Sequence, residues 1–284
     1  MKNNWVLLIS CPDKKGIIAK TSHFLFHHGA NITHTEEHID EQLNMFFMRI
    51  EWDADGFDLS EKELMKQFSK MASSFKMNWN FATNRGTKEI AILVSKEDHC
   101  LYDLLYRHKR RELKGNVRLI ISNHHVTKDI AEDYNIPCHY IPTKNVDRSK
   151  SEKAILSLLN NNNINLVVLA RYMRILSPQF VAQYPNKIIN IHHSFLPAFV
   201  GAKPYHQAHK RGVKIIGVTS HYVNESLDGG PIIEQDVIRI SHKDTTEDLI
   251  NKGRDLEKIV LSRAVKWHLE NSILVYANKT VIFN

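Results

Sequence analysis

Cysteine is scarce in this sequence, and long apolar runs are missing. The three cysteines among 284 residues, Cys11, Cys100 and Cys138, are widely separated and form no C-x-x-C pair. This spacing predicts neither a disulfide framework nor a thiolate zinc site, and it favours a reducing compartment, the cytoplasm by default. No segment approaches the roughly 18 apolar residues of a membrane span, and the first apolar stretch is too short for a signal peptide. We therefore expect no membrane partner.

Acidic residues are fewer than basic ones, 31 against 38, which gives a formal net charge of +7. Such a surplus suits nucleic acid, but it also suits a small anionic substrate such as a polycarboxylate. The densest basic run, residues 107–114, has a helical pattern, and like charges usually cluster there on a solvated face. Because no stacking motif or zinc-finger spacing accompanies it, we expect no nucleic-acid partner. A regulatory protein that senses amino acids or binds nucleic acid remains the alternative outside enzymes.

Residues 1–84 follow the order strand, helix, strand, strand, helix, strand. An apolar run at 5–10 predicts a buried strand, and the first helix is expected to begin near Ile17 and to end before Gly29. Ser60 followed by Glu63 has the spacing of a capping box and predicts the start of the second helix. This pattern predicts a ferredoxin-like βαββαβ domain, followed by the polar linker ATNRGTK.

Residues 85–284 alternate between strands and helices. The short apolar runs EIAILVS, NVRLIIS, CHYIP, LVVLA and KIINI are separated by stretches of helical periodicity. This alternation predicts an α/β fold of Rossmann-like class, with a mainly parallel sheet covered on both faces. Two further strands should precede a long helix at about 245–270, capped near Asp244, and a β-hairpin turned at Asn278-Lys279.

Polar side chains crowd into residues 190–194, NIHHS, directly after an apolar strand. Ligands of open α/β sheets gather beyond the carboxyl ends of the strands, so Asn190 and His192 should face such a site. A second polar segment carries His221 at a strand end and Asp228 before Gly229-Gly230, where the backbone can approach a ligand closely. Amide and imidazole donors suit a developing oxyanion, and a carboxylate can accept a proton from the nucleophile. Together they suit attack on a one-carbon acyl group.

Three other interpretations of these residues compete with acyl chemistry. A metal site could use His192, His193 and Asp228, but successive residues of an extended segment point to opposite sides, so we expect no metal. Ser194 as a nucleophile lacks the G-x-S-x-G elbow. A plain polar loop explains NIHHS in isolation but not the second polar segment.

The stretch NIHHSFLPAFVGAKPYHQAHKRGVKIIGVTSHYVNESLDGGPII resembles the 10-formyltetrahydrofolate-dependent formyltransferases. Their shared motif is Asn-x-His followed downstream by an Asp in an Asp-x-Gly turn. The doubled histidine and the SFLPAF continuation resemble the formyltetrahydrofolate deformylases in particular. The likeness extends through LARYMRILSPQFV and NKGRDLEKIVLSRAV and covers essentially residues 85–284.

This resemblance implies residue roles. Asn190, His192 and Asp228 match the catalytic trio, and His221 matches an auxiliary active-site histidine. His139 falls where relatives that formylate a nucleotide carry an arginine. The folate is implied as a substrate, without any prosthetic group or metal. The implied substrate-binding residues are Met173, Arg174, Ile175 and Leu176, which line a pterin pocket, and Gly229. From the residues alone, the Met-Ile-Leu segment is more typical of a buried core.

The N-terminal unit, with DKKGI after its first strand and GANI before its second, resembles an ACT domain. Such domains commonly bind amino acids between paired copies, so the resemblance implies an amino-acid effector and a homo-oligomer, a dimer or a tetramer. Asp13, Gly16 and Asn31 are the candidate effector-binding residues. Ordinary turn chemistry accounts for the same three residues equally well.

Water is the expected nucleophile because the acceptor loop departs from the transferase pattern. Relatives that formylate glycinamide ribonucleotide carry a glycine-rich loop after their first Rossmann strand, whose N–H groups cradle the phosphate. Here SKEDHCL, residues 95–101, has no glycine, and Glu97 and Asp98 would repel a phosphate. We therefore expect hydrolysis of 10-formyltetrahydrofolate to formate and tetrahydrofolate, which supplies formate for purine synthesis and balances the one-carbon folate pool. Formyl transfer to an amine is the alternative reaction.

Overall fold

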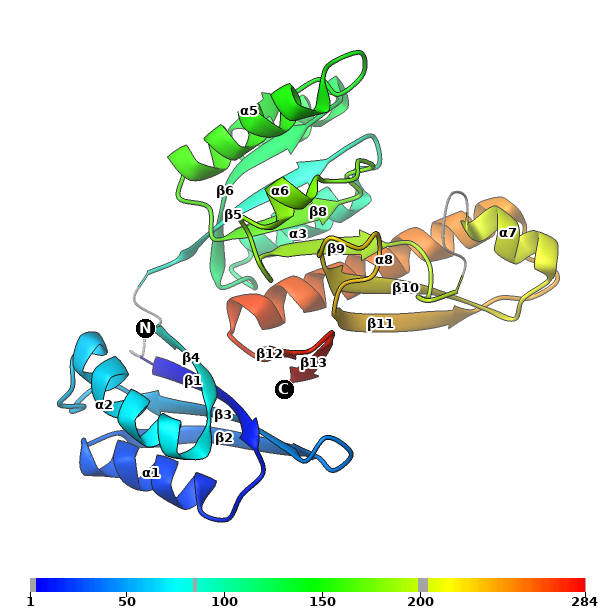
Figure 1. Ribbon diagram of the computed structural model, residues 1–284. Coiled ribbons are helices and arrows are strands. Elements are labelled where there is room, and N and C mark those ends of the chain that lie inside the picture. The colour runs from blue at the N-terminus through cyan, green and yellow to red at the C-terminus, as the bar shows by residue number, and fades with distance from the viewer. Residues whose placement is uncertain (1–3, 84–85, 199–203, 284) are drawn as a thin grey trace. The chain divides into compact units, whose positions relative to one another are not determined.

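The computed structural model describes residues 4–83, 86–198 and 204–283 and contains two compact units (Figure 1). Unit 1 comprises Met1–Gly86 together with Asn271–Asn284, and unit 2 comprises Thr87–Glu270. Within the expected linker, residues 84 and 85 lie outside the described residues, as do residues 199–203 of the SFLPAFVGAKPYHQA stretch. No helix in the described ranges is both long enough and apolar enough to cross a membrane.

Unit 1 is built on a four-stranded antiparallel sheet with strand order β2-β3-β1-β4. Helices α1 (Ile17–His27) and α2 (Glu61–Phe75) bury their apolar sides against one face of it (Figure 1). The capping box expected at Ser60 and Glu63 is present at the start of α2. The predicted βαββαβ order is confirmed. Its strands are β1 (Asn4–Pro12), β2 (Asn31–Asp40), β3 (Met45–Asp53) and β4 (Asn78–Thr83).

The opposite face of this sheet is covered by the hairpin of β12 (Ile273–Tyr276) and β13 (Lys279–Ile282). Leu274 and Phe283 pack there with Leu8 and Phe47. The hairpin therefore belongs to unit 1, whereas the expected division into 1–84 and 85–284 placed it in the second domain. The apolar residues of a hairpin show that it needs a partner surface, but they do not show which sheet provides that surface. The strands enclose residues 277 and 278, so the turn lies one residue earlier than expected.

Unit 2 contains a seven-stranded sheet with order β11-β10-β9-β8-β5-β6-β7. The strands β5 to β9 run parallel, whereas β10 and β11 are antiparallel to their neighbours, so the sheet is mainly parallel as predicted. Its strands are β5 (Lys88–Val94), β6 (Gly115–Ser122), β7 (Cys138–Tyr140), β8 (Leu166–Ala170), β9 (Ile188–His192), β10 (Ile215–Tyr222) and β11 (Ile232–Arg239).

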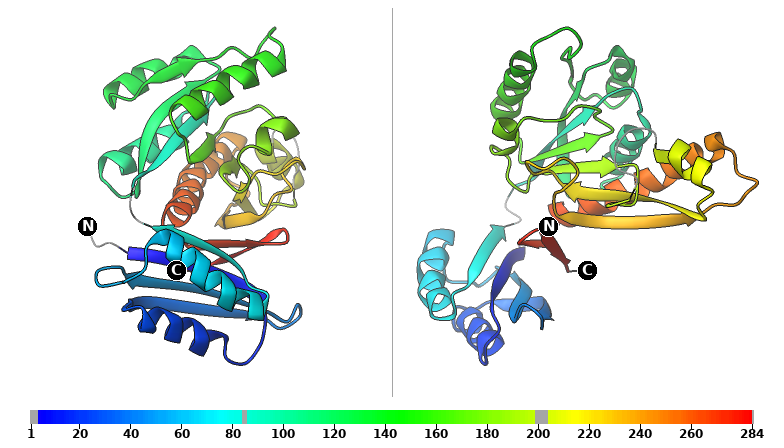
Figure 2. Two further views of the ribbon diagram at one scale, coloured as in Figure 1. Left: turned by 60° about the vertical axis from the view of Figure 1, so that its left-hand side comes forward. Right: turned by 45° about the vertical axis from the view of Figure 1, so that its right-hand side comes forward.

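Helices cover both faces of this sheet (Figure 1 and Figure 2). Helix α5 (Arg148–Asn161) and the short α6 (Pro178–Val181) share one core cluster with alternate residues of β5, β6 and β8. Helices α3 (His99–Lys109) and α8 (Thr246–Leu269) contact each other on the other face. Thr245 caps α8 in a capping box with Asp248, one residue after the expected cap. The remaining short elements are the 3-10 turn η1 (His125–Thr127), α4 (Lys128–Asp133) and α7 (Pro204–Arg211).

Candidate active site

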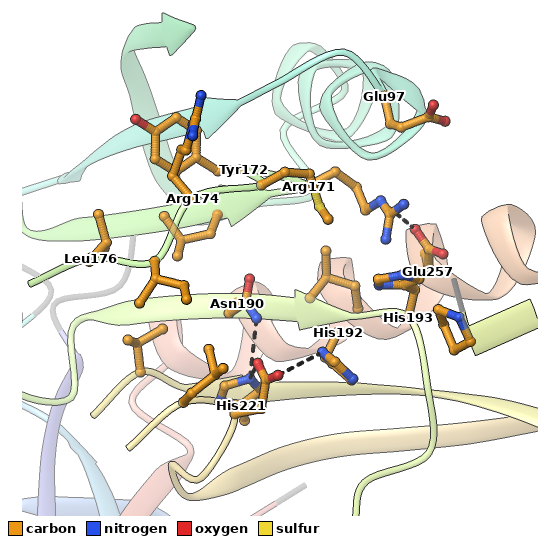
Figure 3. Close-up of a pocket in the computed structure, with 18 of the residues that line it drawn as sticks. Glu97, Arg171, Tyr172, Arg174, Leu176, Asn190, His192, His193, His221 and Glu257 are labelled. Atoms are coloured by element: carbon orange, nitrogen blue, oxygen red, sulfur yellow. Dashed lines mark hydrogen bonds and ion pairs between the residues drawn. The ribbon is translucent and has the colours of Figure 1, made fainter. Parts of the chain in front are cut away.

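Strand register places the first three polar side chains of the site. Asn190 and His192 are two positions apart on β9 and therefore share one face of the sheet. On the antiparallel neighbour β10, His221 is the cross-strand partner of Asn190. Cross-strand partners bring their side chains within contact range, and Asn190 Nδ2 lies 3.2 Å from His221 Nε2 (Figure 3).

Asp228 reaches this pair from the turn between β10 and β11. Its Oδ2 lies 3.4 Å from His192 Nδ1, and its Oδ1 lies 3.8 Å from His221 Nε2. The turn is tight, because Asp228 has a left-handed backbone with φ of 52° and a side chain on Gly230 would meet the carbonyl oxygen of Tyr222. All four residues that the sequence assigned to catalysis thus lie together. The hydrogen bond with His192 outweighs burial and lowers the pKa of Asp228, so the carboxylate is ionised at neutral pH.

His221 is held as one neutral tautomer. Its Nδ1 lies 2.8 Å from the carbonyl oxygen of Tyr222, which can only accept, so Nδ1 carries the proton. Burial lowers the pKa of His221 despite that hydrogen bond. The lone pair on Nε2 therefore accepts from Nδ2 of Asn190, which fixes the orientation of the amide. On His192, the ring nitrogen Nε2 is buried and has no hydrogen-bond partner within the described parts of the chain.

The four residues open into a cavity of about 670 Å³ in unit 2. Met173, Arg174, Ile175 and Leu176, from the loop after β8, all line it. Met173 and Ile175 are 58% and 62% exposed, so their apolar side chains are available to a flat ring instead of being buried in the core. Gly229 is not among the lining residues, and its carbonyl oxygen accepts from Nδ2 of Asn224.

The other side of the cavity contains charged residues that the sequence did not indicate. Glu257, from α8, is 1% exposed in its side chain and lies 3.5 Å from Nε of Arg171 (Figure 3). His99 Nε2 lies 2.7 Å from Oε2 of the same carboxylate, and the hydroxyl of Tyr205 donates to Oε1 at 2.8 Å. Burial alone would raise the pKa of Glu257, but His99, Arg171 and Tyr205 together lower it. We call these four residues the Glu257 cluster.

His193 lies between His192 and the Glu257 cluster. Its ring centroid is 5.5 Å from that of His192 and 6.0 Å from that of Tyr205. Burial, and then the charge of Arg171, lower the pKa of His193 to about 4, so this imidazole is neutral at physiological pH. Figure 3 shows His193 beside Glu257, on the opposite side from His221. The cavity therefore has one side formed by Asn190, His192, His221 and Asp228 and a charged side, with a neutral histidine between them.

One group in the described residues has the composition of a metal site. Ligand atoms of His99, Cys100 and Glu257 all lie within 4.8 Å of one another. The carboxylate of this group is already hydrogen-bonded to His99 and Tyr205 and paired with the guanidinium of Arg171. A fixed positive charge at that distance opposes a divalent cation, so this donor set fits an internal ion pair better than a metal.

The other residues singled out in the sequence lie elsewhere. His139 is on β7, the edge strand of the large sheet, and does not line the cavity. In unit 1, Asp13 and Gly16 precede α1, and Asn31 is the first residue of β2. Gly16 has a left-handed backbone with φ of 92°, and the backbone N–H of Asp13 donates to the carbonyl oxygen of Asn44.

A sequence signal for the Glu257 cluster did exist. Leu249, Gly253, Leu256 and Val260 form the buried stripe of α8, and Glu257 lies in the middle of that stripe. A carboxylate on the apolar stripe of a helix requires a partner, because an unpaired buried charge is costly. No comparable signal identifies Arg171 as that partner, since it comes from a loop distant in the sequence.

Comparison with known proteins agrees with this geometry. Residues 88–265 match the model of the formyl transferase family, and residues 5–69 match that of the ACT domain. A formyltetrahydrofolate deformylase from Synechocystis sp. is 50% identical over 277 residues, which is 98% of this chain and 97% of that relative. The crystal structure of a formyltetrahydrofolate deformylase from Pseudomonas syringae has a TM-score of 0.96 at 44% identity, covering 100% of this chain and 95% of that one.

The likeness to transformylases is weaker and is confined to one part of the chain. The structure of glycinamide ribonucleotide transformylase 1 from Symbiobacterium toebii has a TM-score of 0.68 at 27% identity. It covers 72% of this chain and 98% of that one. With both domain models matched and near-complete coverage by deformylases, the chain belongs to the formyltetrahydrofolate deformylase family.

Proposed function

We propose that this chain hydrolyses 10-formyltetrahydrofolate to formate and tetrahydrofolate, using Asp228, His192 and Asn190. The observation that carries the proposal is the distance of 3.4 Å between Oδ2 of Asp228 and Nδ1 of His192 at the wall of the cavity. It brings an ionised carboxylate, which can accept a proton, next to an imidazole and an amide, which can donate hydrogen bonds.

In the proposed reaction, Asp228 accepts a proton from water while the water oxygen bonds to the formyl carbon. The carbonyl oxygen becomes an oxyanion, and His192 and Nδ2 of Asn190 donate hydrogen bonds to it. Positive charge on the imidazole is stabilised by the nearby carboxylate of Asp228. The bond from the formyl carbon to N10 then breaks, and N10 takes the proton that the water gave up. His221 does not touch the formyl group in this scheme and acts as a positioning residue for Asn190.

Met173, Arg174, Ile175 and Leu176 are proposed to hold the pterin ring. A flat heterocycle requires apolar side chains with accessible surface, and Met173 and Ile175 have them. Formate released by this reaction would supply purine synthesis, and the tetrahydrofolate would return to the one-carbon pool.

The decisive assay measures formate and tetrahydrofolate released from 10-formyltetrahydrofolate by the purified chain in buffer alone. We expect the two products in equal amounts without an added acceptor. If tetrahydrofolate appears only when an amine is present, with a formamide in place of formate, or if no turnover occurs at all, the proposal fails.

We further propose that unit 1 binds an amino acid through Asp13, Gly16 and Asn31, in a homodimer or tetramer located in the cytoplasm. The match to the ACT domain model and the position of these three residues around the first turn and the start of β2 support it. Glycine and methionine are the first candidates because both depend on one-carbon units. Calorimetric titration of the full chain with each amino acid tests the binding, and sedimentation analysis tests the assembly. Absence of binding across the panel, or a monomer at all concentrations, would refute these parts.

A further inference from the structure

The backbone of Arg171 has a conformation that usually favours glycine. It directly follows β8, at the sheet edge where Asn190 and His192 lie, and its φ is +61°. Side chains rarely adopt this region because the Cβ atom crowds the neighbouring carbonyl group. The conformation is held from the β5–α3 loop, since the N–H of Ser95 donates to the carbonyl oxygen of Arg171 and the hydroxyl of Ser95 accepts from the N–H of Met173. Position 171 thus carries a large side chain although glycine would be less strained there.

The side chain of Arg171 is buried in the cavity wall instead of pointing to solvent. It is 13% exposed, and it lies against Glu257, which is in turn held by His99 and Tyr205. Tyr205 reaches the carboxylate only because position 253 on α8 is glycine: a Cβ atom there would lie 2.1 Å from the tyrosine oxygen. Hydrogen bonds from His99 and Tyr205 thus hold the carboxylate of Glu257 beside this guanidinium, whose Nε and Nη1 are buried without a hydrogen-bond partner in the described residues.

This arrangement occupies the side of the cavity on which an acceptor would be expected. Residues 95–101, where the resemblance would place the phosphate of a nucleotide acceptor, contribute His99, the first residue of α3, to the Glu257 cluster and Glu97 to the lining of the cavity. Glu97 forms an ion pair of 2.7 Å with Arg254. The ring of His193 lies 6.0 Å from that of Tyr205, on the charged side, and 5.5 Å from that of His192.

We propose that Arg171 is a specificity-determining residue, which closes the acceptor side of the cavity so that water, but not an amine, reaches the formyl carbon. Water is small and neutral and enters the remaining space. An amine needs room for its carbon substituents, and in its protonated form it is repelled by the guanidinium. The inference rests on the proposed function, because it assumes that the formyl carbon lies next to Asp228 and His192.

The reaction that Arg171 prevents is formyl transfer. In it, the bond from the formyl carbon to N10 breaks and a bond from that carbon to the amine nitrogen forms. The proton lost by the amine moves to N10, so the products are a formamide and tetrahydrofolate without formate. Hydrolysis gives one formate for each tetrahydrofolate, and transfer gives none, so the ratio of the two products measures the choice of nucleophile.

The test uses Arg171→Gly, in which glycine suits the left-handed backbone. Arg111→Gly is a matched control, because Arg111 is exposed in another part of the unit and also has a φ of +61°. A double variant, Arg171→Gly with Glu257→Gln, removes both charges and leaves no unpaired buried carboxylate. Each is assayed with 10-formyltetrahydrofolate and excess glycinamide as the probe amine, measuring tetrahydrofolate, formate and N-formylglycinamide.

The wild-type chain and Arg111→Gly should release tetrahydrofolate and formate in equal amounts despite the glycinamide. With Arg171→Gly or the double variant, N-formylglycinamide should rise at least about tenfold above wild type, since a single steric misfit gives discrimination of about 10- to 200-fold. Equal amounts of tetrahydrofolate and formate in both Arg171 variants would overturn the inference. Production of N-formylglycinamide by the wild type or by Arg111→Gly would overturn it as well. Failure of the proposed function is distinguishable, because the wild type would then release no formate even without glycinamide.

Discussion

The carboxylate of Asp228 and the imidazole of His192 lie 3.4 Å apart, although His192 ends strand β9 and Asp228 belongs to the turn after β10. His192 is fixed by the register of β9 with β10, whereas Asp228 is fixed by the turn that follows β10. That turn combines a left-handed residue with a glycine at position 230 that admits no side chain. The proximity of these two side chains therefore depends on backbone conformation as much as on side-chain identity.

Replacing Asp228 by Asn tests the role of the carboxylate. Asn tolerates the left-handed backbone, so the fold should be retained. Without a proton acceptor, kcat should fall by about 10²- to 10⁴-fold, while KM should change little. Steady-state formate release measures both constants. The matched control is Asp255→Asn, at an exposed position of α8, which should behave as wild type. Comparable turnover by Asp228→Asn would rule out its assigned role.

The pH dependence of hydrolysis should report the state of Asp228. The hydrogen bond with His192 lowers the pKa of this carboxylate, so the base stays ionised until the pH falls below the usual range for aspartate. Activity should therefore be lost only as the pH falls through this lowered pKa. In His192→Ala, the remaining kcat/KM should begin to fall at a higher pH than in the wild type, because the hydrogen bond that lowers the pKa of Asp228 is absent. An unmoved or lowered acid limb would contradict this coupling.

His221 should act on the reaction through Asn190. His221→Leu removes the acceptor that orients the amide, and kcat should fall by about 10- to 100-fold, the cost of a small misplacement of a catalytic group. His221→Gln supplies an oxygen that can accept from Asn190 and should recover part of the loss. KM should stay near the wild-type value in both. Equal losses of kcat in the two variants would indicate that His221 only fills space and does not orient the amide of Asn190.

Gly253→Ala should destabilise the protein although alanine favours helices. The new methyl group would lie 2.1 Å from the hydroxyl oxygen of Tyr205 and would separate it from Glu257. Crowding costs about 1–3 kcal/mol, which outweighs the gain of about 1 kcal/mol from helix propensity. Thermal unfolding measures the change. Asn251→Ala, at an exposed position of the same helix, should be neutral or slightly stabilising. A Tm for Gly253→Ala at or above wild type would show that Tyr205 moves without cost.

Phe283→Ala tests whether the hairpin belongs to unit 1. Phe283 is 2% exposed and packs with Phe47, so the truncation should destabilise unit 1 by about 3–5 kcal/mol. Three of the four tryptophans, at positions 5, 52 and 79, belong to unit 1, so denaturation followed by their fluorescence reports its unfolding. Leu43→Ala, at a position 52% exposed in the same unit, is the matched control. Equal midpoints for the two variants would refute the assignment.

Local patterns in the sequence were sufficient for most of the fold. Each apolar run between Lys88 and His192 is a strand of the large sheet, and Ser60 with Glu63 starts α2 as their spacing indicates. The position of the hairpin at residues 273–282 was not predictable in the same way. Its alternating residues reveal a strand pair with an apolar side, but the surface that buries this side is a long-range property of the packed chain.

The proximity of Asn190, His192 and Asp228 was predictable because parallel strands place their ends at one edge of the sheet. Asn190 and His192 follow from that rule, and Asp228 from the glycine-containing turn beside it. The charged half was missed because Arg171 and Glu257 meet only when the loop after β8 reaches α8. Separate local patterns contain no information about such a contact.

The hairpin also has a consequence for synthesis of the chain on the ribosome. Leu8 and Phe47 are translated early, but the residues that cover them, Leu274 and Phe283, emerge only after all of unit 2 has been made. Because translation runs from the N-terminus, the apolar face of this sheet that contains Leu8 and Phe47 remains exposed to solvent and prone to association throughout that interval. Unit 1 therefore begins to form before unit 2 but can be completed only after all of unit 2 has been synthesised.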